Sequence, residues 1–166
     1  MHFGKRNIIY DEADVALKYH ELAEKDFASA NILARNELYN EAAYFYIQAM
    51  EKYTKEQICH KIDPSNKYFA NIIKDTGHSL DKSLTLLIEI YCGKDLAAKQ
   101  QIENILLKNI LKDTKFEILN NTLRYPRYEY KYENYTVIEL SKEDTDILCE
   151  MTSLLKKALN DLYKIR

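Results

Sequence analysis

Glycine and proline are scarce in this sequence, which has three glycines, two prolines and no tryptophan among 166 residues. Folds made of strands and tight turns need many more residues that tolerate or enforce a turn. The scarcity therefore disfavours an all-β fold and favours helices separated by a few breaks. With 46% hydrophobic and 30% charged residues, the composition is that of an ordinary globular domain. A single domain of this length buries about 70% of the surface that its unfolded chain exposes.

Paired cysteines and long apolar runs are also missing. Cys59, Cys92 and Cys149 stand far apart, so the sequence has neither a zinc ribbon nor a Cys-x-x-Cys redox motif. We expect buried, reduced thiols, and neither a metal nor another cofactor. The first residues lack the apolar stretch of a signal peptide, and no apolar run approaches the roughly 18 residues of a membrane span. We therefore expect a soluble cytoplasmic protein without a membrane contact.

An excess of positive charge is lacking as well. The sequence has 24 Lys and Arg residues against 26 Asp and Glu, which gives a formal net charge of -2. A chain with this balance is not attracted as a whole to nucleic acid or to an anionic membrane. Nucleic acid would have to bind through a local group of cations.

Apolar residues recur three and four positions apart over most of the chain, as they do on the buried face of a helix. This pattern predicts an all-α, up-and-down bundle of about five helices, formed by residues 1–166 as one domain. Gly93 favours a helix end, and Ser141 followed by Asp144 is typical of a helix start. The main helices are expected over residues 12–35, 38–60 and 95–111, with another from His78 or Ser79 to Cys92 and a short one over 67–75. A last helix is expected to start within Ser141–Asp144 and to bury apolar residues from Leu148 to Leu162.

Residues 120–140, before the last expected helix, differ from the rest of the chain. Pro126 and five tyrosines between Tyr125 and Tyr135 predict an extended loop rather than a helix over 120–135. The segment from Tyr135 to Leu140 has the composition of a strand, but a lone strand cannot form a stable sheet.

The first two expected helices are joined by the short link 34–37, so they should fold back on each other as an antiparallel pair. On the second helix, small or pliable residues permit close approach and three bulky residues fill the core. Charged residues on the same helix are expected to stay solvated. The first group is Ala42, Ala43, Ala49 and Met50, the second is Tyr46, Ile47 and Tyr53, and the third is Glu41, Glu51, Lys52 and Lys55.

This helix pair resembles the opening of the HEPN family, small helical domains of prokaryotes linked with nucleotides and RNA. Gly77-His-Ser-Leu80 followed by Leu84 is similar to the family's Gly-His-Asp-Leu-x-x-Leu, with Ser79 in place of the usual Asp; either residue can cap a helix. Leu123-Arg-Tyr-Pro126 resembles the Arg-Tyr-Pro that precedes the family's last helix. In the helix pair the matching residues are Ala23, Asp26, Tyr39, Asn40, Ala42, Gln48, Ala49, Glu51 and Lys52.

The resemblance implies a homodimer, a possible nucleotidyltransferase partner and a role in a toxin–antitoxin or defence system. The family's ribonucleases carry Arg, four to six intervening residues and then His. This pairing supplies a proton relay near neutral pH and a cation for the phosphate. None of the five arginines here has a histidine at that spacing, so the ribonuclease motif is absent.

The tyrosine-rich segment interleaves cations with aromatic rings, a combination that suits a phosphate and a stacked base. In the alternative interpretation, the tyrosines pack over the bundle and the arginines pair with nearby acids. Glu129 and Glu133 also disfavour nucleic-acid binding, because they repel phosphate. A second polar group could line a cleft between helices or form a solvated rim. The candidate ligand-binding residues are Arg124, Tyr125, Arg127, Tyr128, Lys131 and Tyr132, and the second group comprises Asp26, Glu51, Lys52 and His78.

The histidines have structural interpretations. His20 falls in the apolar repeat of its helix, His60 ends a helix where the dipole favours a cation, and His78 lies beside a helix start. No two histidines are three or four residues apart, so no helical metal pair arises.

Three functions remain open: a nucleotide- or RNA-binding module that does not cleave, an endoribonuclease with a rearranged site, and a purely structural protein-interaction domain. The enzyme would use Arg127 with Tyr132 in place of histidine. A phenol with an ordinary pKa of about 10 relays protons poorly at neutral pH, so the binding module is the leading hypothesis.

Overall fold

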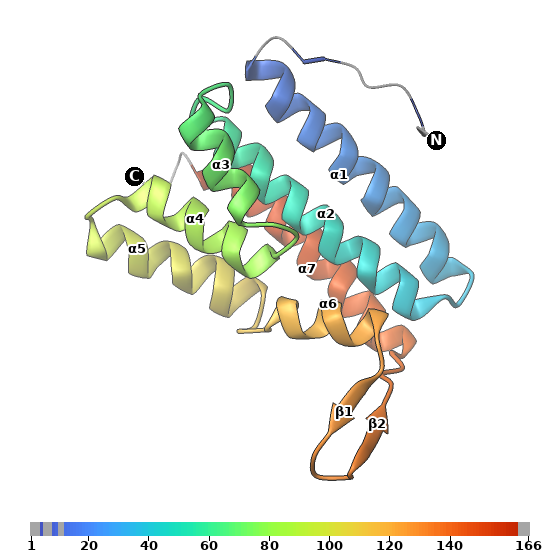
Figure 1. Cartoon of the computed structure of the whole chain (residues 1–166). Helices are drawn as coiled ribbons and strands as arrows, with labels where there is room; N and C mark the ends of the chain where they lie inside the picture. Colours follow the sequence, from blue (N-terminus) through green and yellow to red (C-terminus); the bar gives the residue numbers. More distant parts are fainter. Residues whose placement is uncertain (1–3, 5–7, 10–11, 163–166) are drawn as a thin grey trace.

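The computed structural model describes residue 4, residues 8–9 and residues 12–162 of the chain. It is the expected all-α bundle, with one small sheet (Figure 1). Helix α2 is central: it packs along α1 on one side and contacts α4 and α7 on others. In chain order the elements are α1 (Glu12–Arg35), α2 (Tyr39–Cys59), α3 (Lys67–Asp75), α4 (Leu80–Cys92), α5 (Leu96–Glu103), the π-helical segment η1 (Asn104–Ile110), α6 (Phe116–Arg124), β1 (Arg127–Glu129), β2 (Asn134–Thr136) and α7 (Lys142–Asp161).

Local capping explains several helix ends that the sequence predicts. The Ser79 hydroxyl accepts a hydrogen bond from the Lys82 amide at 3.3 Å, so α4 begins after Ser79 rather than at His78. Ser141 and Asp144 cap each other's backbone at the start of α7. Gly93 ends α4 at a φ of 54°, a left-handed conformation that glycine adopts without strain.

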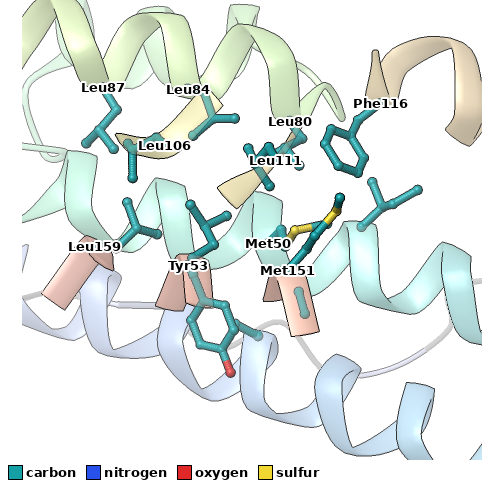
Figure 2. Close-up of a cluster of buried hydrophobic side chains, with 14 of the residues drawn as sticks. Met50, Tyr53, Leu80, Leu84, Leu87, Leu106, Leu111, Phe116, Met151 and Leu159 are labelled. Carbon is teal, nitrogen blue, oxygen red and sulfur yellow. The ribbon is translucent and has the colours of Figure 1, made fainter. Parts of the chain in front are cut away.

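The core is built on the inner face of α2 (Figure 2). Met50 of α2 lies near leucines of α4, and Met151 and Leu159 of α7 close the cluster. The buried Tyr53 ring points away from α4, toward α1. Each fully buried leucine or methionine contributes about 1.5–3 kcal/mol through removal of apolar surface from water. The helix expected over residues 95–111 covers the correct residues, but its second half is the π-helical η1 rather than an α-helix.

Residues 120–135 depart from the expected extended loop. Asn120 to Arg124 form the second half of α6, and β1 and β2 pair as an antiparallel hairpin. Helix α6 was missed because its start is capped from a distance: the Asp81 carboxylate of α4 accepts the Glu117 amide at 2.7 Å. The strand-like character expected of 135–140 is confined to Asn134–Thr136, whose partner is β1.

Candidate nucleic-acid interface

Residues 125–136 form a hairpin that projects from the lower end of the bundle in Figure 1, and we call it the tyrosine hairpin. Tyr128 pairs with Tyr135 across the two strands, and Arg127 pairs with Thr136. The turn, residues 130–133, closes with Glu133 at a φ of 49°, which permits the chain to reverse.

The chain returning from the hairpin is fixed to α2 by Asn40. The Asn40 side-chain amide donates to the Ile138 carbonyl at 2.8 Å, and its oxygen accepts from the Leu140 amide at 2.9 Å. The Asn40 side chain thus provides the hydrogen bonds that the backbone of residues 138 and 140 would otherwise form with a neighbouring strand. This contact explains an asparagine at the start of α2 and holds the base of the hairpin in place.

Three tyrosine rings lie together on one face of the hairpin. Tyr128 contacts Tyr130 edge-on with ring centroids 5.3 Å apart, and contacts Tyr135 edge-on at 5.4 Å. Strand alternation puts residues 128 and 130 on one side, and cross-strand pairing adds Tyr135. In an edge-on contact the edge of one ring covers one face of the other, so the remaining ring faces stay open, and Tyr130 is 88% exposed. These tyrosines therefore do not pack over the bundle.

Three cations accompany the rings. The Arg127 Nε lies 3.2 Å from a Glu129 carboxylate oxygen, as the alternative interpretation expected. The Arg124 guanidinium sits over the Tyr125 ring at 5.1 Å and donates to its hydroxyl at 3.1 Å. At the turn, the Lys131 ammonium lies 5.3 Å from the centroid of the Tyr132 ring.

A cavity of about 490 Å³ opens between α6 and the start of the hairpin. It brings three of the six candidate ligand-binding residues together: Tyr125, Arg127 and Tyr128. Arg124 lines a different cavity of about 210 Å³, against Tyr44 of α2. Lys131 and Tyr132 lie at the turn and line neither of these two cavities. The arginines therefore do not converge in one cleft.

The second polar group is divided into two pairs. Lys52 of α2 bonds Asp26 of α1, and both side chains are about four-fifths buried. Glu51 instead faces Lys55 one turn later, with their charged atoms 2.7 Å apart. His78 is largely exposed and lies 3.9 Å from Glu51.

The expectation that Glu51 and Lys55 stay solvated is wrong. Glu51 is 3% exposed and Lys55 is 6% exposed. Lys55 also donates to the Gly77 carbonyl at 2.6 Å, whereas the second Glu51 oxygen has no hydrogen-bond partner among the described residues. The loop before α4 covers this part of α2, and sequence periodicity cannot show that cover.

A polar network between α1, α2 and α7 was missed entirely. Glu24 accepts the Tyr53 hydroxyl at 2.6 Å and also bonds Lys156, which lies 132 residues away. Burial and the bond to Glu24 raise the pKa of Tyr53 well above its ordinary value, so Tyr53 stays a donor. His20 bonds Glu56 at 3.0 Å, in keeping with its interpretation as a satisfied interface residue. No pattern in the sequence reports contacts this distant.

Other kinds of site are not formed by the described residues. Within residues 12–162 and the few described before them, no group of three or more His, Cys, Asp or Glu could hold a metal ion. None of the described helices is long and apolar enough to cross a membrane.

No protein-family model matches the chain, and no significant match was found among curated proteins or solved structures.

Proposed function

We propose that this protein is a cytoplasmic, HEPN-like module that binds single-stranded RNA or a nucleotide on its tyrosine hairpin without cleaving it. The observation that carries the proposal is the exposed group of rings formed by Tyr128, Tyr130 and Tyr135, next to a cavity lined by Arg127. Every base has a flat face that can stack on a tyrosine ring, and a guanidinium binds a phosphate through two hydrogen bonds.

The acids of the hairpin oppose this function only weakly. Residues 124–136 contain three cations and two acids, which leaves one net positive charge. The Arg127–Glu129 pair is substantially exposed on both sides, and exposed pairs of this kind contribute little to stability. Arg127 can therefore exchange Glu129 for a phosphate at small cost. Local cations then supply the attraction that the net charge of the chain does not.

Binding without cleavage fits the geometry better than the rearranged enzyme. Arg127 begins β1, whereas Tyr132 lies in the turn at the far end of the hairpin. No hydrogen bond joins the two side chains, both of which belong to the described part of the chain, and no histidine is bonded to either. The hairpin therefore offers a cation and stacking surfaces, whereas the Arg127–Tyr132 pair that the rearranged enzyme would use is not formed.

The resemblance to HEPN domains extends the proposal to a homodimer, with a nucleotidyltransferase as a possible partner in a toxin–antitoxin or defence system. A protein-interaction role is the second candidate. It is favoured by the free strand edges of the two-stranded hairpin and by its exposed Tyr135, followed by the exposed Val137, because such an edge can accept a further strand.

Titration of a fluorescent 12-nucleotide single-stranded RNA at low salt tests the RNA proposal. We expect wild type to bind this strand about tenfold more tightly than a duplex of the same sequence, because paired bases cannot stack on the rings. Arg127→Ala should weaken binding and reduce its salt dependence, since one phosphate contact is lost. The matched control is Lys74→Ala, which removes an exposed cation from α3. Equal binding by Arg127→Ala and wild type, cleavage of the RNA, or no binding at low salt would each overturn the proposal.

A further inference from the structure

A third cavity, of about 220 Å³, lies where the end of α1, the first turns of α2 and the start of α7 meet. Polar side chains from all three helices help to line it: Asn31 and Arg35 come from α1, Tyr39 from α2 and Lys142 from α7. None of these residues belongs to the tyrosine hairpin, so the cavity is a separate feature of the molecule.

Asn31 presents an unused donor at this cavity. Its side-chain oxygen accepts the Tyr46 hydroxyl at 2.8 Å and lies 3.6 Å from the Cys149 sulfur. Burial raises the pKa of Tyr46, so its hydroxyl remains protonated and continues to donate. These two contacts fix the amide with its oxygen turned to Tyr46 and Cys149. The amide nitrogen has no partner among the described residues.

The charges around the cavity leave an excess of cation. Among the described residues, Arg35 has no ion-pair partner, whereas Arg127 is paired with Glu129. Lys142 lies 3.3 Å from Asp146 of the same helix, and both side chains are more than three-fifths exposed. Such an exposed pair within one helix is weak and readily opened. The cavity thus has two cations and one acid.

We propose that this cavity binds the phosphate group of a small phosphomonoester. A guanidinium, an ammonium, an amide and the Tyr39 phenol reach it from three helices, and this spread suits the tetrahedral phosphate better than a planar carboxylate. Arg35 supplies a bidentate contact, Lys142 a point charge and Asn31 a neutral donor of fixed orientation. The volume admits a phosphate with a compact organic group attached.

Calorimetric titration with inorganic phosphate, in a phosphate-free buffer, tests this site. We expect Arg35→Ala to weaken phosphate binding by about tenfold or more, since it removes a charge-assisted contact. Asn31→Asp should weaken it similarly, because the carboxylate still accepts from Tyr46 and Cys149 but replaces the donor with a negative charge. The matched control, Lys25→Ala, removes an exposed cation from the same helix and should bind as wild type does. Acetate should bind at least about tenfold more weakly than phosphate, because it can use fewer of the donors.

Cys149 gives a second, local measurement because it lines the cavity and is partly exposed, so the expectation of a buried thiol is wrong at this position. Saturating phosphate should slow the alkylation of Cys149 by iodoacetamide at pH 8. Mass spectrometry of the peptide that contains Cys149 measures the rate of this alkylation. Cys59 and Cys92 are buried, and burial raises the pKa of each, to about 11 for Cys59, so both thiols should stay unmodified.

Unchanged Cys149 alkylation, equal binding by Asn31→Asp and wild type, or equal affinity of the protein for acetate and phosphate would overturn the proposal. Phosphate protection should survive Tyr130→Ala, so its loss in that variant would also contradict an independent site.

Discussion

Lys55→Met is expected to destabilise the fold by about 3–5 kcal/mol, because it leaves the Glu51 carboxylate buried without its cation. Glu51 and Lys55 are both almost completely buried, and their charged atoms lie 2.7 Å apart. Methionine fills much of the lysine volume, so the loss reports the unpaired charge rather than a cavity. Urea denaturation followed by circular dichroism measures the change in the free energy of unfolding.

The double variant Glu51→Leu/Lys55→Met separates the buried charge from the packing. Replacing both partners with apolar residues removes the desolvation cost of two ions and also the Glu51 oxygen that lacks a partner. We expect the double variant to recover most of the stability lost in the single variant, or to exceed wild type. Lys18→Met is the matched control, since Lys18 pairs with Glu21 on the surface and should lose about 1 kcal/mol or less. A loss of that size in Lys55→Met would contradict the burial of this pair.

Tyr130→Ala is expected to weaken RNA binding by about 1–3 kcal/mol, a factor of roughly 5 to 150, because one base loses its stacking partner. Tyr130 is the most exposed of the hairpin tyrosines, so its removal should leave the thermal unfolding temperature nearly unchanged. Tyr130→Phe keeps the ring and should bind nearly as wild type does. Fluorescence anisotropy with single-stranded RNA measures all three proteins.

A matched control separates stacking at the hairpin from a general effect of surface tyrosines. Tyr68 on α3 is 68% exposed and also makes an edge-on contact, with Phe69. Tyr68→Ala should therefore leave RNA binding unchanged. Similar losses in Tyr68→Ala and Tyr130→Ala would show that the hairpin has no special part in binding.

Much of the bundle follows from local chemistry. The spacing of apolar residues predicts the long helices. Ser79 and Ser141 predict helix starts and Gly93 predicts a helix end, and the structure has these ends at those residues. Helix α6 could not be obtained in this way, because its cap comes from Asp81 of another helix. Its two central asparagines, at positions 120 and 121, also favour a loop when the helix is judged by propensity alone.

The candidate site was accessible to sequence reasoning only where its residues are neighbours in the chain. Tyr125, Arg127 and Tyr128 are nearly adjacent, and they do line one cavity. Arg124 is just as near in sequence, but it ends α6 and turns toward Tyr44 of α2. The cavity with Arg35 and Lys142 joins residues more than 100 positions apart, and only the packing of α7 against α1 and α2 reveals it.

Photo-crosslinking with RNA that contains 4-thiouridine tests the central claim most directly, because it reports where a base lies against the protein. After irradiation of the wild-type complex and digestion, mass spectrometry should locate the crosslinks within residues 125–136. The same experiment with Tyr130→Ala should give a clearly lower yield. Crosslinks confined to α3 or α4, or none at a saturating RNA concentration, would contradict RNA binding by the tyrosine hairpin.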